Sequence, residues 1–259
     1  MSSFDILVND LHKLGLNKGD TVIVHSSLKS MGTVEGGADT VIDAIIEAVG
    51  EEGTVLFPAL SFSPCCSTLK FDIRNTPCCV GHIPETFRKR EGVIRSFHPS
   101  HSVCAYGKLA KELTQDHIKD NTPVGKNSPY RKLTEVGGKI LMLGCGLRPN
   151  TFMHGVEEVG NAPYCLGEAK TYEMIDYDGK VVYKDIIGHH FHRPEGNFIQ
   201  RYDRAVDVLE KGVDYVEGIV HGATAYLFDA KTLCDKAAEK MQTSPAYFVD
   251  DENNILGLR

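Results

Sequence analysis

Apolar residues along this chain fall into short runs that alternate with helical repeats from the amino terminus onward. The runs at 21–24 and 54–60 are rich in β-branched or large apolar residues, which predicts buried strands. Apolar residues three and four positions apart predict helices at 4–14 and through 41–49, each followed by a glycine that can end it. Strands that alternate with helices in this way predict an α/β fold around a central sheet.

The rest of the chain continues the pattern with shorter elements. The same criteria predict helices from 83, over 109–117 and over 128–136, a strand at 140–143, a hairpin of 171–175 with 181–187, and helices over 198–209 and 224–241. Residues 61–81 are rich in Pro, Cys and Ser and are expected to form a long loop, and the acidic tail is expected to fray. Since no linker interrupts the composition, we expect residues 1–259 to form a single domain, with a hairpin and helices appended after about residue 165.

The composition is that of an ordinary globular protein, with 42% hydrophobic and 24% charged residues. A net charge of −7 argues against nucleic acid and acidic membrane surfaces as partners and is compatible with a cationic substrate. The sequence shows neither a membrane-length apolar stretch nor a basic-then-apolar leader, so we expect a cytoplasmic protein. Its eight cysteines are therefore expected to be reduced thiols.

Residues 140–160 hold the strongest candidate chemistry. The predicted strand 140–143 leads through a Gly-rich turn to Asn150 or Thr151, either of which can cap a helix. His154 lies early in that helix, and Glu157 and Glu158 follow three and four residues later on the same face. Because ligand sites in α/β folds lie at the carboxyl ends of strands, the pattern favours a functional imidazole, although an exposed acidic first turn would also fit.

Three other polar regions are candidates for ligand or metal binding. The segment from His25 to Gly32, followed by Gly36 and Gly37, lies between a predicted strand and helix, where backbone N–H groups can bind phosphate, but an ordinary capped loop fits equally well. Three histidines at 189, 190 and 192 are spaced so that their side chains leave different faces of a strand, and Cys78, Cys79 and His82 match no standard zinc site. We therefore predict no metal site.

Five ordered segments resemble the aminoglycoside 3-N-acetyltransferase family, the antibiotic N-acetyltransferase fold, over nearly the whole chain. They are residues 24–32 with 36–38, 53–58, 83–88, 95–103 and 150–158. The resemblance implies a mixed central sheet flanked by helices. It also implies direct transfer of acetyl from acetyl-CoA to an amine, most readily the 3-amino group of an aminoglycoside antibiotic, without an acetyl-cysteine intermediate.

The same resemblance implies roles for individual residues. His154 would be the general base, since an imidazole that titrates near neutrality can deprotonate an ammonium group. A carboxylate would orient its ring, and Glu85 and Glu157 are the two candidates. The residues expected to bind the cofactor are His25, Ser26, Ser27, Leu28, Lys29, Ser30, Arg95, Ser96, Ser102 and Val103.

The acceptor is less well defined than the donor. A polycationic aminoglycoside calls for several carboxylates, and Asp72, Glu157 and Glu158 are the candidates for binding it. Because the predicted loops contain no dense acidic cluster, a different amine is an open alternative. A metal-dependent or Ser–His hydrolase, and a coenzyme A-binding protein without transferase activity, are further alternatives. An oligomer is possible.

Overall fold

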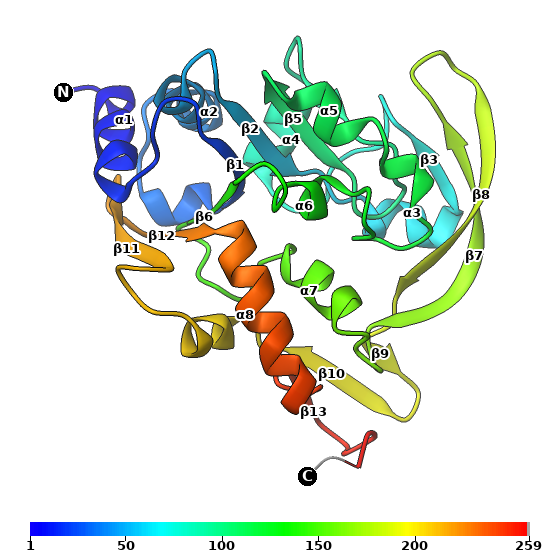
Figure 1. The fold of residues 1–259 in the computed structure, drawn as a ribbon. Coiled ribbons are helices and arrows are strands. Elements are labelled where there is room, and N and C mark those ends of the chain that lie inside the picture. Colours follow the sequence, from blue (N-terminus) through cyan, green and yellow to red (C-terminus); the bar gives the residue numbers. More distant parts are fainter. Residues whose placement is uncertain (258–259) are drawn as a thin grey trace.

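The computed structural model describes residues 1–257 and shows a seven-stranded mixed sheet at its centre, in the order β11-β12-β6-β1-β2-β5-β4 (Figure 1). The strands of the described chain are β1 (Thr21–Ser26), β2 (Thr54–Pro58), β3 (Lys70–Asp72), β4 (Ile94–Arg95), β5 (Val103–Gly107), β6 (Lys139–Leu143), β7 (Leu166–Ile175), β8 (Val181–His189), β9 (His192–Arg193), β10 (Gly196–Gln200), β11 (Tyr215–Val220), β12 (Ala223–Asp229) and β13 (Val249–Asp251). Strand β1 pairs in parallel with β2 and β6, and the outer strands are antiparallel. The predicted mixed α/β sheet is confirmed.

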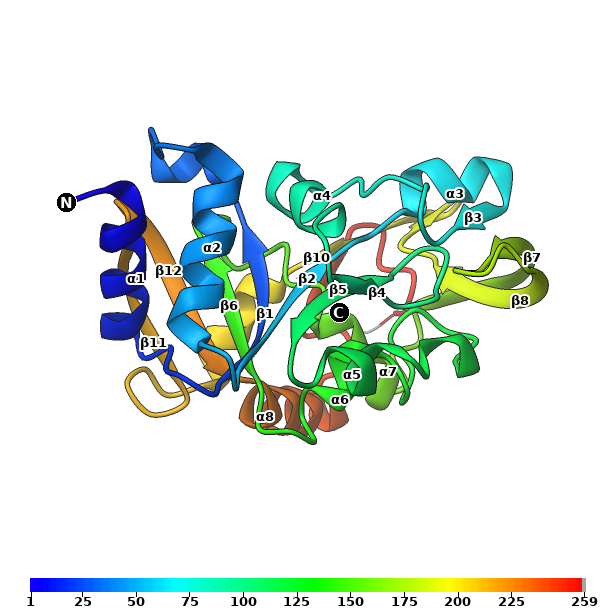
Figure 2. The ribbon, with the colours of Figure 1, turned by 90° about the horizontal axis from the view of Figure 1, so that it is seen from above.

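Helices cover both faces of this sheet. They are α1 (Ser3–Leu14), α2 (Gly37–Val49), α3 (Phe62–Thr68), α4 (His82–Arg88), α5 (Ala110–Thr114), α6 (Pro129–Lys132), α7 (Met153–Val159) and α8 (Ala230–Thr243), with the 3-10 segments η1 (Leu28–Met31), η2 (His117–Lys119) and η3 (Tyr202–Val208). Figure 2 shows α1, α2 and α4 on one side of the sheet and α5, α6, α7 and α8 on the other. No helix in the described part of the chain is both long enough and apolar enough to cross a membrane.

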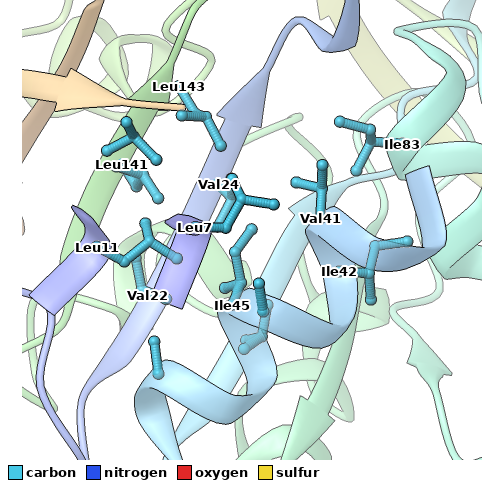
Figure 3. Packing of buried hydrophobic residues seen from close by; sticks show 14 of the residues in the cluster. Leu7, Leu11, Val22, Val24, Val41, Ile42, Ile45, Ile83, Leu141 and Leu143 are labelled. Carbon is cyan, nitrogen blue, oxygen red and sulfur yellow. The ribbon is translucent and has the colours of Figure 1, made fainter. Parts of the chain in front are cut away.

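The two cores follow from the alternation of side chains along β1. Val24 packs on one face with Leu7 of α1 and with Val41 and Ile45 of α2, as Figure 3 shows. Ile23 points to the opposite face and joins the core under α5 to α8. Because successive strand residues face opposite sides, a continuously apolar strand such as β1 must be buried on both.

Four sequence predictions are corrected. Residues 61–81 include helix α3 and strand β3, because Cys65 is buried in a small core with neighbouring strands. Residues 224–229 belong to β12, since pairing with β6 overrides a helical spacing, and the helix starts only after Asp229, whose side chain accepts from the Thr232 N–H at 2.7 Å. Phe198 lies in β10 rather than in a helix, and the tail through Asp251 pairs with that strand instead of fraying.

The predicted hairpin is confirmed as β7 and β8, which are longer than expected and extend away from the central sheet (Figure 1). Strand β3 joins its edge in parallel. The last residue of β8 is His189, and the chain from there to β10 returns toward α7. The hairpin therefore brings a distant segment next to the helix that carries His154.

Candidate active site

The site begins where β1 and β6 end side by side at the carboxyl edge of the sheet. Residues 144–152 leave β6, and the Asn150 side chain accepts from the Phe152 N–H at 3.2 Å, which fixes the turn into α7. The Thr151 N–H donates to His25 Nε2 of β1 at 3.1 Å. These contacts place His154 in the first turn of α7, 8% exposed.

His154 is held by Glu157 and by Tyr202 of η3. Its Nδ1 lies 3.1 Å from Glu157 Oε2 and 2.8 Å from the Tyr202 hydroxyl, and that hydroxyl donates to the same carboxylate oxygen at 2.7 Å. Burial, followed by the neighbouring Glu157, raises the pKa of Tyr202 well above its usual value, so its hydroxyl keeps its proton.

This triangle of hydrogen bonds bears on which ring nitrogen of His154 carries the proton. A carboxylate accepts hydrogen bonds and cannot donate them, and the single hydroxyl hydrogen of Tyr202 is directed at Glu157. The proton between His154 and Glu157 must therefore reside on His154 Nδ1, which leaves a lone pair on Nε2. The geometry therefore favours the Nδ1–H tautomer of His154.

Two cavities meet at this imidazole. The first has a volume of about 310 Å³ and is bounded by the ends of β1 and β2 and by the turn before α7. The second has a volume of about 360 Å³ and lies between α3, the 100–101 turn and the end of β8. Phe62, His154 and Gln200 line both cavities. The His154 imidazole thus faces two adjacent cavities.

Of the cofactor-binding residues predicted in β1 and η1, some line the first cavity and the others do not. His25 and Ser26 line the first cavity, where His25 Nδ1 and Ser26 Oγ are buried and lack a hydrogen-bond partner among the described residues. Burial lowers the pKa of His25 to about 3, so it stays neutral. Ser27 donates its N–H to the Leu143 carbonyl, Leu28 packs against the core, and Lys29 and Ser30 are exposed.

The cofactor-binding residues predicted at 95–103 are buried and line neither cavity, which corrects the prediction that they contact the cofactor directly. Arg95 is 3% exposed, and its guanidinium donates to Ser102 Oγ at 2.8 Å and to the carbonyls of Thr76 and Ala59. Ser96 Oγ accepts from the Val103 N–H at 2.8 Å. The polar groups of these residues are therefore engaged within the protein, where Arg95 ties β4 to the 59–76 segment.

The Ser96–His117 pair also bears on the hydrolase alternative. Ser96 Oγ lies 2.8 Å from His117 Nδ1, but His117 Nε2 contacts the Pro123 carbonyl at 3.2 Å, and both side chains are almost completely buried. A nucleophilic serine needs access to substrate. This pair has the hydrogen bond of a Ser–His dyad without that access.

Glu85 does not orient His154, which corrects one of the two predicted carboxylate assignments. Its carboxylate accepts from Arg88 Nε at 2.8 Å and from the Cys78 N–H at 2.8 Å, and it pairs with Lys89 at 3.0 Å. Hydrogen bonding to Arg88 is the main reason that the pKa of Glu85 is lowered to about 2. Glu85 therefore fixes α4 to the preceding segment.

We expect Glu85→Gln to lower stability by about 1–2 kcal/mol at neutral pH, after allowance for solvent screening, and to leave turnover nearly unchanged. Because the folded-state pKa of Glu85 is depressed, its contribution is present above pH ~4.5 and is lost as the pH falls toward about 2. Urea unfolding of both proteins at neutral pH and at pH 3 measures this, and a large loss of turnover with unchanged stability would contradict it.

The three carboxylates expected to bind a cationic acceptor are also engaged elsewhere. Asp72 accepts from the N–H groups of Arg74 and Asn75 in a turn. Glu158 accepts from Thr122 Oγ1 and the Val124 N–H, and Glu157 is completely buried behind His154. Among the described residues that line the two cavities, none is an aspartate or glutamate.

Sequence reasoning missed Tyr202, Arg148 and the histidines that approach His154. Tyr202 lies 48 residues from His154, and no motif marks it. Of the described residues around the first cavity, Arg148 is the one with a positive charge, and it follows the Gly-rich turn that the sequence did single out. His101 and His189 lie in segments far apart in the sequence, and nothing local indicates that they converge on His154.

Known proteins resemble this chain over most of its length. The family model described as aminoglycoside 3-N-acetyltransferase matches residues 23–242. An aminoglycoside N(3)-acetyltransferase III from a Salmonella species is 34% identical, with 86% of this chain and 85% of that protein covered. Aminoglycoside N(3)-acetyltransferase VII from Streptomyces paromomycinus is 31% identical, with 88% of each chain covered.

Solved structures agree with these matches. Aminoglycoside acetyltransferase AAC(3)-Xa superimposes with a TM-score of 0.78 at 30% identity and 92% coverage of each chain. AAC-IIIb in a binary complex with CoASH has a TM-score of 0.76 at 26% identity, covering 94% of this chain and 97% of that one. AAC-VIa bound to sisomicin has a TM-score of 0.76 at 26% identity, covering 94% and 98%. This chain therefore belongs to the aminoglycoside 3-N-acetyltransferase family.

Proposed function

We propose that the protein transfers the acetyl group of acetyl-CoA to the amine of a small acceptor, with His154 as general base. The observation that carries the proposal is the position of His154, which lies between two cavities while Glu157 and Tyr202 hold its Nδ1. Direct transfer requires the donor and the acceptor to be bound next to the same base, and two cavities that share His154 are consistent with this requirement.

In the proposed reaction, the Nδ1–H tautomer leaves Nε2 of His154 free to accept a proton. His154 Nε2 removes a proton from the attacking ammonium or amine, and the nitrogen forms a bond to the thioester carbonyl carbon. The tetrahedral intermediate then collapses, the C–S bond breaks, and the coenzyme A thiolate leaves and takes the proton held by the His154 imidazolium. When the acceptor enters as an ammonium ion, its additional proton passes to solvent. Glu157 stabilises the imidazolium that forms on His154 in between, because its carboxylate lies 3.1 Å from Nδ1.

The first cavity is the proposed donor site. His25 and Ser26, each of which has an unpartnered polar atom, line it, and Arg148 supplies a cation for the diphosphate of coenzyme A. The complex of AAC-IIIb with CoASH supports use of the same donor here. The pantetheine thioester would then reach His154 from the side of β1.

The second cavity is the proposed acceptor site, and an aminoglycoside amine is the first candidate, as the names of the relatives indicate. A second candidate is an amine with fewer positive charges. The acid-free lining of both cavities favours it, because multiple ammonium groups are normally bound by carboxylates.

A comparison of acceptors tests the proposal and separates the two candidates. Acceptor-dependent release of coenzyme A thiol is measured from acetyl-CoA with aminoglycosides and, in parallel, with monoamines and diamines of similar size. We expect saturable release with at least one class. A larger kcat/KM for the less charged amines supports the second candidate, and a larger value for aminoglycosides supports the first. Thiol release that no amine accelerates would contradict N-acetyl transfer.

A further inference from the structure

Three histidines from different segments converge where the second cavity meets α7. His101 follows β4 in a buried turn, His154 lies in α7, and His189 ends β8. One ring nitrogen of each lies within 4.8 Å of the corresponding nitrogens of the other two. The ring centroids of His154 and His189 are 4.0 Å apart, and those of His101 and His189 are 4.7 Å apart.

One nitrogen in this histidine cluster has no hydrogen-bond partner among the described residues. His189 Nε2 is buried and lacks a hydrogen-bond partner among the described residues, although Glu158 Oε1 lies 3.5 Å away. A buried polar atom without a partner costs about 1–3 kcal/mol. The cluster therefore has one nitrogen without a partner next to two further imidazoles. A ligand bound by all three histidines would give that nitrogen a partner.

The surroundings are those of a metal site rather than of a hydrophobic contact. In a tetrahedral Zn²⁺ site the ligand nitrogens are about 2.0–2.1 Å from the ion, so only small side-chain movements separate these imidazoles from a coordinating set. The Nδ1–H of His154 is directed at Glu157, and His101 Nδ1 lies 2.9 Å from Ser100 Oγ. Partners of this kind orient metal-bound histidines, and nearby carboxylates offset the charge of the ion.

We propose that His101, His154 and His189 form a binding site for a divalent transition-metal ion such as Zn²⁺, and that the bound ion inhibits the enzyme. Inhibition rests on the proposed function, because coordination occupies the lone pair of His154 Nε2 that would otherwise accept the proton of the amine. Imidazole ligands favour zinc, copper and nickel over magnesium or calcium. The fourth position would face the second cavity and hold water or an incoming amine.

Metal binding is measured directly, without reference to turnover. Chelator-stripped protein is dialysed against Zn²⁺ or Co²⁺, and metal per chain is determined by mass spectrometry. We expect one tightly bound ion, a visible Co²⁺ spectrum of a four-coordinate site, and none of the intense near-ultraviolet absorption that thiolate ligands give. His189→Gln and His101→Gln should each weaken binding by more than about a hundredfold, which exceeds the usual effect of losing an outer partner.

The matched control is His192→Gln, which removes an exposed histidine whose Nδ1 contacts Asn197, and it should bind metal like the wild type. Circular dichroism confirms that each variant is folded. Zinc should inhibit wild-type acetyl transfer reversibly, and His189→Gln should be resistant when compared with its own metal-free rate.

Several outcomes would overturn the proposal. They are less than one ion per wild-type chain, unchanged affinity in folded His189→Gln and His101→Gln, or a thiolate spectrum from the cysteines. A protein that binds one ion through His189 but transfers no acetyl group would support the site and overturn both the inhibition and the proposed function.

Discussion

Replacing His154 by Gln is expected to lower kcat for acetyl transfer by about 10²–10⁴-fold, the usual contribution of a general base. Glutamine roughly preserves the volume of the imidazole but has no lone pair that is basic near neutral pH. Because the first cavity is bounded mainly by β1, β2 and the turn before α7, the affinity for coenzyme A should change little. Stopped-time assays of thiol release and calorimetric titration with coenzyme A measure the two quantities separately.

The matched control for this variant is His12→Gln, which removes an exposed histidine from α1. It should turn over at the wild-type rate. If His154→Gln retained more than a tenth of the wild-type kcat, His154 would not be the base. If it lost coenzyme A affinity and kcat together, His154 would be acting mainly in donor binding.

Replacing Glu157 by Gln is expected to be nearly as damaging, with a loss of roughly 10²–10⁴-fold in kcat. The carboxylate can only accept, and this keeps the proton on His154 Nδ1. A glutamine amide can donate to Nδ1 instead, which would move the ring proton to Nε2 and remove the base. Nitrogen-15 spectra of labelled histidine report the tautomer alongside the rate.

Glu158→Gln is the control for this second variant, since it makes the same change one residue along the helix. Glu158 contacts Thr122 and Val124 rather than His154, so we expect less than about a tenfold loss of rate and a lower unfolding temperature. Equal losses of rate in the two variants would contradict the orienting role of Glu157.

The sequence allowed the centre of the site to be predicted because its key relationship is local. His154 and Glu157 are three residues apart on one helix that follows a buried strand, and this spacing alone brings their side chains together. The mixed sheet and its two helical layers were likewise predictable from the runs at β1, β2 and β6 together with the family resemblance.

The remaining features depend on tertiary contacts that local patterns do not encode. Glu85 and Arg95 have the chemistry of site residues, but Arg88 and the carbonyls around Arg95 occupy their polar groups. Tyr202 reaches His154 only through a tertiary contact of η3, the segment that follows β10. His189 joins the site because the hairpin returns to α7, so a histidine whose spacing argued against metal binding meets two others from elsewhere in the chain.

The central claim is acetyl transfer from acetyl-CoA to an amine, and isotope tracing tests it most directly. Wild-type protein is mixed with acetyl-CoA carrying a carbon-13-labelled acetyl group and with the best acceptor from the panel, and the products are analysed by mass spectrometry. The account predicts that the acceptor gains one labelled acetyl group on nitrogen for each thiol released. Release of labelled acetate in place of acetylated amine, at the same rate with and without acceptor, would contradict it.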